Sequence, residues 1–70
     1  MQKMYYKFLY AYWVGYTPKQ QIYYFNADND KQVFNYVTKN ILKNQICGYY
    51  ITEINRYSIP KNSKIITLED

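Results

Sequence analysis

The stretch Met4–Val14, with the sequence MYYKFLYAYWV, decides how this chain folds, because it reads as a β-strand with bulky apolar residues on both faces. Alternation places Tyr6, Phe8, Tyr10, Tyr12 and Val14 on one face and Tyr5, Leu9, Ala11 and Trp13 on the other. Lys7 interrupts the run and is expected to point to solvent. One helix layer covers one face of a sheet, so in a chain of 70 residues the second face is expected to need water-tolerant side chains, a second subunit or a partner.

The remaining strands are predicted from short apolar runs between turn residues. A hairpin loop over residues 15–19 leads into a strand at 20–27 that pairs antiparallel with the first strand. A third strand is predicted at 46–56, and a short edge strand at 64–68.

A helix is predicted from Asn29 to Asn44, because Asn29 can cap its free N–H groups and Gln32 has capping-box spacing. Asn44 is expected to end the helix, and Cys47 to be a buried apolar residue. The stripe expected to face the sheet consists of Val33, Phe34, Val37, Ile41 and Leu42. The predicted fold is α+β, a single ββαββ domain over residues 1–70 in which one helix packs on one face of a small antiparallel sheet.

The uncovered face is the candidate site. Ala27 leads into the helix and is expected beneath it, which puts Phe25 and Tyr23 in the core and Ile22 and Tyr24 outside. Tyr49 and Ile51 of the third strand are grouped with the outside residues. The predicted partner-binding residues are Tyr5, Lys7, Leu9, Trp13, Ile22, Tyr24, Tyr49 and Ile51.

Composition argues against catalysis and cofactors. The chain has no His, a single Cys, no Gly-rich loop and five scattered carboxylates, so no catalytic, metal or cofactor site is expected. No signal peptide or run long enough to span a bilayer is recognised, which predicts a cytoplasmic protein. The net charge of +4 comes mostly from Lys that accompanies many Asn, Ile and Tyr, a mixture typical of AT-rich coding sequences.

Two kinds of binding protein fit these features. In the first, the aromatic face binds a protein, either a different protein or a second copy in a homodimer. In the second, it stacks on single-stranded nucleic acid. The cations that would follow the nucleic-acid backbone are Lys3, Lys7, Lys19, Arg56, Lys61 and Lys64.

The run IYYFNADNDKQVFNYV, Ile22–Val37, resembles the strand-to-helix junction of small accessory proteins of phages and mobile elements, including DpnD/PcfM-like domains. Size, AT-rich composition and lack of catalytic motifs also resemble anti-CRISPR proteins. The resemblance implies an inhibitor that occupies a site on a host defence protein. A chain of +4 cannot mimic DNA, so it would bind a protein surface or a protein–nucleic-acid complex. The resemblance assigns no functional residues.

Overall fold

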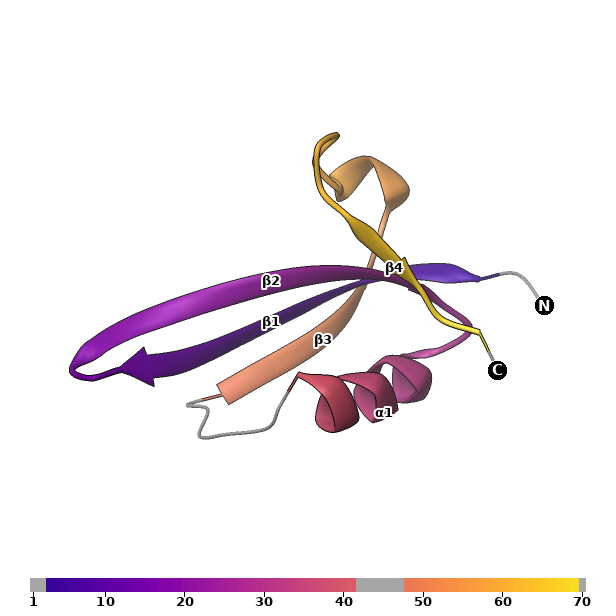
Figure 1. The fold of residues 1–70 in the computed structure, drawn as a ribbon. Coiled ribbons are helices and arrows are strands. Elements are labelled where there is room, and N and C mark those ends of the chain that lie inside the picture. The colour runs from indigo at the N-terminus through magenta and orange to yellow at the C-terminus, as the bar shows by residue number, and fades with distance from the viewer. Residues whose placement is uncertain (1–2, 42–47, 70) are drawn as a thin grey trace.

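The computed structural model describes residues 3–41 and 48–69 of the chain (Figure 1). Two long strands, β1 (Met4–Val14) and β2 (Thr17–Ala27), form a hairpin that leads into helix α1 (Asp30–Asn40). Strand β3 (Gly48–Ile54), a short 3-10 turn η1 (Arg56–Ser58) and strand β4 (Ile65–Thr67) follow. The predicted α+β fold with ββαββ order is confirmed, and the predicted bounds of the first strand match β1.

The hairpin turn is tighter than the predicted five-residue loop. Gly15 has φ +63°, and no other described residue has positive φ, so Gly15 and Tyr16 form a two-residue turn of the type II′ pattern. β2 therefore begins at Thr17 and includes Pro18, which lies opposite Trp13. Pro18 is tolerated in a strand where its missing N–H would point away from the neighbouring strand.

The sheet has the order β3-β1-β2-β4 and is mixed, which corrects the prediction of a purely antiparallel sheet. β1 pairs antiparallel with β2 and with β3, whereas β4 pairs parallel with β2. The strands β3 and β4 consequently run in the same direction at opposite edges. A hairpin cannot join two such strands, so residues 55–64 form a crossover connection. The edge position predicted for the last strand is confirmed.

The predicted N-cap of α1 is confirmed. The Asn29 side chain accepts a hydrogen bond from the Gln32 N–H at 2.8 Å. The Gln32 side chain in turn accepts a hydrogen bond from the Asp28 N–H at 2.8 Å, whereas a capping box would use the N–H of the N-cap residue Asn29. The helix ends at Asn40, and the expectations for Leu42, Asn44 and Cys47 lie outside the described residues.

The core lies between α1 and one face of the sheet. Phe8, Phe25, Ala27, Val33 and Val37 are fully buried there, and Tyr6 and Leu68 are nearly so. Rings continue along this face beyond Phe8, because the Phe8, Tyr10 and Tyr12 centroids follow one another at 5.4 Å. Phe34 departs from the prediction, since it is 40% exposed and reaches the sheet at its edge, 6.2 Å from the Tyr49 ring.

The molecule is elongated because the hairpin extends past the helix (Figure 1). Its principal extents are 43 × 25 × 16 Å, and its radius of gyration is 12.6 Å. A compact chain of this length would have a radius of gyration of about 11 Å. The distal part of the hairpin is therefore a thin layer with few elements to cover it.

The buried phenol of Tyr6 is expected to make the fold sensitive to alkaline pH. Burial, and then the carboxylates of Glu53 and Asp30, raise the pKa of Tyr6 above its ordinary value of 10.0. The native state thus holds this proton more tightly than the unfolded chain, and its stabilising contribution falls as pH rises above 10. Tyr6→Phe is expected to make stability decline less steeply over this range in urea titrations. An equally steep decline in Tyr6→Phe would contradict this.

Candidate binding face

The face of the sheet opposite α1, the outer face, carries the residues predicted to bind a partner. Strand register places Ile22, Leu9 and Tyr50 in one row across the sheet. The next row toward the start of β1 contains Ile65, Tyr24, Lys7 and Thr52, and the row after that contains Asn26, Tyr5 and Ile54. In the other direction lie the row of Gln20, Ala11 and Gly48 and the pair of Trp13 and Pro18. The predicted outward placement of Tyr5, Leu9, Trp13, Ile22 and Tyr24 is confirmed.

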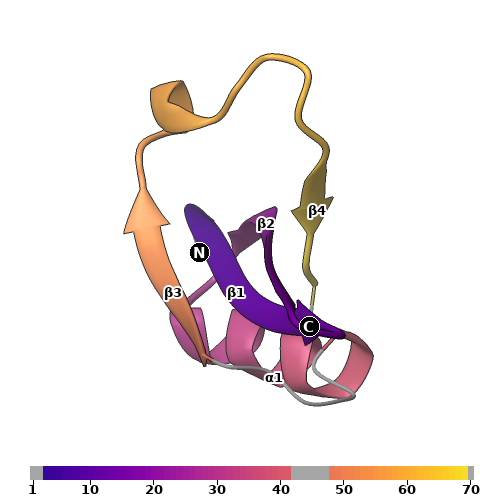
Figure 2. The ribbon, with the colours of Figure 1, turned by 90° about the vertical axis from the view of Figure 1, so that its left-hand side faces the viewer.

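One end of the outer face is covered by the chain itself. Figures 1 and 2 show the crossover from β3 to β4 arching over the side of the sheet opposite α1. The Arg56 guanidinium lies over the Tyr5 ring, 5.7 Å from its centroid, and Ile59 of the crossover is 5% exposed. Tyr5 and Tyr24 are accordingly half-buried. The prediction that the helix is the one cover is therefore wrong at this end, because a connection between opposite edge strands has to cross the sheet.

The outward placement of Tyr49 and Ile51 is also wrong. Ile51 lies opposite Phe8 and Tyr49 opposite Tyr10, so both side chains are on the helix side. The Tyr49 ring lies 6.0 Å from that of Phe8, and Ile51 packs against the core. Tyr50 takes their place on the outer face, where it is 46% exposed. The pairing of β3 with β1 therefore places the faces of β3 opposite to the prediction.

The uncovered end of the outer face forms an apolar cluster, the outer patch, which consists of Leu9, Ala11, Trp13, Ile22 and Tyr50. Trp13 is 57% exposed and Ile22 is 40% exposed. Between Trp13 and the row of Leu9 lie Ala11 and Gly48, and a Cβ added to Gly48 would meet no atom within 4 Å. Large side chains thus lie on either side of a row in which Ala11 has only a methyl group and Gly48 has no side chain.

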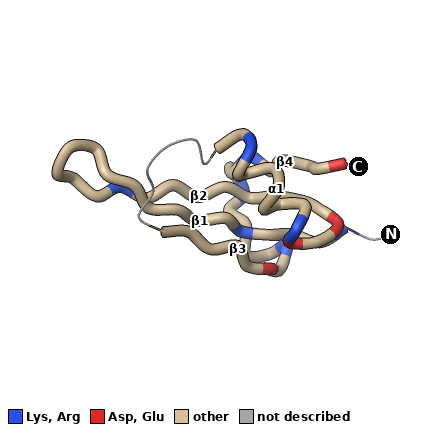
Figure 3. The backbone as a smooth tube through the Cα atoms, turned by 90° about the horizontal axis from the view of Figure 1, so that it is seen from below, with Lys and Arg blue, Asp and Glu red and all other residues tan. Residues whose placement is uncertain are grey.

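The cations do not gather around the outer patch. The Lys3 ammonium donates to the Leu68 carbonyl and pairs with Asp28 at 3.5 Å, so Lys3 holds the two ends of the chain together. Lys19 lies opposite Tyr12 and therefore on the helix side. Lys7 and Arg56 are on the outer face, but at the end that carries Tyr5. Figure 3 shows the acidic positions of the described backbone at the end of the molecule away from the hairpin turn.

Among the described residues, no group of three or more His, Cys, Asp or Glu side chains is placed where it could hold a metal ion. None of the helices in residues 3–41 and 48–69 has the length and apolar character needed to cross a bilayer.

Comparison with protein-family models, with curated proteins and with solved structures finds no match to this chain. A function is therefore inferred from the chemistry of the protein surface.

Proposed function

We propose that this protein is a non-enzymatic binding module that holds another protein against its outer patch. The observation that carries the proposal is the joint exposure of Trp13, Ile22 and Tyr50 on one uncovered end of a sheet. Trp and Tyr are the side chains that contribute most to binding energy at protein interfaces. Contiguous exposed apolar residues on a small chain mark interaction sites.

The partner we propose is a host protein, and the protein is proposed to act in the host cytoplasm as a phage or mobile-element inhibitor. The support is the composition, the net charge of +4 and the resemblance of Ile22–Val37 to small accessory proteins. Binding at an aromatic patch blocks a partner by occupying its surface and needs no bond-making chemistry, which suits a chain without His.

A single-stranded nucleic acid is the second candidate ligand. It is favoured by Lys7 and Arg56, which place cations on the outer face for phosphates, and by the exposed Trp13 and Tyr50 rings, on which bases can stack. The separation of these cations from Trp13 favours the protein partner. Titration of Trp13 emission with oligonucleotides distinguishes the two, because nucleic-acid binding gives quenching that weakens with added salt.

Trp13→Ala is expected to weaken partner binding by about 2 kcal/mol or more, roughly thirtyfold, and to change stability little, because the side chain lies outside the core. Pull-downs from a bacterial host lysate would compare the parent, Trp13→Ala and Tyr57→Ala. Tyr57 is 95% exposed in η1, away from the outer patch, and is the matched aromatic control. A partner lost with Tyr57→Ala but kept with Trp13→Ala would contradict the proposed site.

A homodimer through the same patch is the remaining outcome. Sedimentation equilibrium of the parent and of Trp13→Ala detects it, because a dimer that depends on the patch dissociates in the variant. Such a result would replace the foreign partner with a second copy.

A further inference from the structure

One edge of β2 is paired with β1, and the opposite edge is paired at one end alone. β4 pairs with Tyr24, Phe25 and Asn26. Within the described part of the chain, no strand pairs with this edge over residues 17–23, which we call the open edge. An open strand edge presents unpaired N–H and C=O groups that can hydrogen-bond an added strand.

The direction of the backbone groups follows from the pairing. The Asn26 carbonyl accepts a hydrogen bond from the Leu68 N–H at 2.8 Å, so it points toward the β4 side. Backbone groups alternate along a strand, so those of Ile22 and Gln20 point to the same side. Their N–H and C=O groups face outward along the open edge, and so does the Pro18 C=O. An added strand would therefore form backbone hydrogen bonds with these groups.

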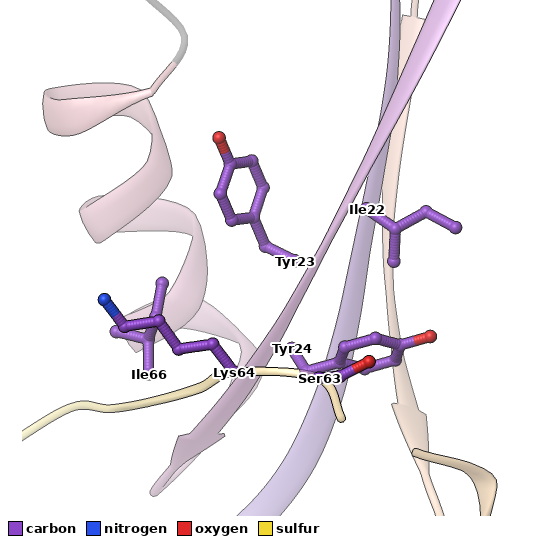
Figure 4. Close-up of a pocket in the computed structure, with 6 residues that line it drawn as sticks. All are labelled: Ile22, Tyr23, Tyr24, Ser63, Lys64 and Ile66. Atoms are coloured by element: carbon purple, nitrogen blue, oxygen red, sulfur yellow. The ribbon is translucent and has the colours of Figure 1, made fainter. Parts of the chain in front are cut away.

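The two sides of the open edge differ in chemistry. On the outer-face side it presents Ile22, which is itself a residue of the outer patch. On the helix side it presents Lys19, Gln21 and Tyr23. At the end where β4 begins, a pocket of about 290 Å³ is lined by Ile22, Tyr23, Tyr24, Ser63, Lys64 and Ile66. Figure 4 shows the Lys64 ammonium on the same side of the sheet as Tyr23, with Ile22 pointing to the opposite side.

We propose that the open edge of β2 binds an extended acidic peptide segment of a partner protein as an added β-strand. Its acidic side chains lie near Lys19 and Lys64, and the alternate apolar side chains continue the outer patch beside Ile22. Both charged side chains placed beside the edge are basic, which selects a segment of opposite charge. This goes beyond a partner on the outer patch, and either mode of binding can hold without the other.

A second copy of the chain suits the open edge less well. Edge pairing of two copies would join two chains of net charge +4 and bring two Lys19 side chains onto neighbouring strands. Lys19 on the edge also discourages pairing with another basic edge. An acidic segment gains from the same charges.

The test uses an eight-residue peptide in which valine alternates with glutamate. We expect it to protect the Gln20 and Ile22 amides from hydrogen exchange, followed by NMR, and to bind at least tenfold more tightly than the same peptide with lysine in place of glutamate. Two further peptides, N-methylated at every valine or at every glutamate, decide whether the backbone is used. In an added strand one set of N–H groups faces β2, so one methylated peptide loses binding and the other keeps it.

A protein variant gives an independent check. Gln20→Pro removes one outward N–H in the same register as Pro18, and is expected to lower peptide affinity about tenfold, whereas Gln20→Ala keeps the N–H and the affinity. Circular dichroism establishes that both variants are folded. Equal binding of both methylated peptides to the parent would overturn the proposal, as would protection of these amides in a peptide-free dimer. Peptide binding that persists in Trp13→Ala separates the open edge from the outer patch.

Discussion

Phe8→Ala is expected to destabilise the protein by about 3–5 kcal/mol. Phe8 has no exposed surface and lies in the central part of the sheet, opposite Tyr23 on β2 and Ile51 on β3. Its ring lies 5.4 Å from that of Tyr10 and 6.0 Å from that of Tyr49. Removing it opens a cavity between three strands, and the surrounding rings can fill that space only in part.

This loss is severe because the total free energy of unfolding of such a small chain is small. At roughly 0.05–0.15 kcal/mol per residue, a chain of this length has a total stability of about 4–10 kcal/mol. Urea unfolding followed by circular dichroism measures the change in midpoint. Phe34→Ala is the matched control, because Phe34 is 40% exposed and the same atoms are removed. If the two variants lost equal stability, the core would not be centred on Phe8.

Local signals in the sequence were sufficient to predict the helix and the strands, and to predict which side chains of β1 and β2 lie on the helix side of the sheet. β1 is apolar on both sides and long, and the Asn29 cap follows directly from side-chain chemistry. The face of β2 could be assigned because Ala27 leads into the helix and is buried beneath it, and the face of β1 because Lys7 is expected to point to solvent. The outward placement of Ile22 follows from Ala27 by alternation, and that of Trp13 follows from Lys7.

The face of β3 and the cover over Tyr5 depend on contacts distant in sequence. β3 alternates equally well in either sense, and its pairing with β1 decides that Ile51 rather than Tyr50 turns inward. Residues 46–47, at the predicted start of this strand, lie outside the described part of the chain. The crossover follows from β3 and β4 lying at opposite edges of the sheet, an order that no local pattern encodes. The candidate site is therefore smaller than predicted and consists of the outer patch. The open edge of β2 is a feature that only the structure reveals.

Leu68→Ala is expected to destabilise the protein by about 2–5 kcal/mol, although Leu68 follows the last strand. Leu68 is 7% exposed and belongs to the core cluster with Phe25 and Val37. Its N–H donates to the Asn26 carbonyl, and its carbonyl accepts from the Lys3 ammonium. Thr67→Ala is the matched control, because Thr67 is an exposed neighbour on β4, and its removal is expected to change stability little.

Leu68→Ala is also expected to change the outer face. β4 is three residues long, and Leu68 holds in place the end of the crossover that covers Tyr5 and Tyr24. Loosening that end would uncover Tyr5 and Tyr24, which the parent keeps half-buried. We therefore expect faster hydrogen exchange in β4 and the crossover than in the β1–β2 hairpin, together with increased binding of a hydrophobic dye. A uniform increase in exchange across the chain would instead show that Leu68 stabilises the whole core, with the crossover and the hairpin unfolding as one unit.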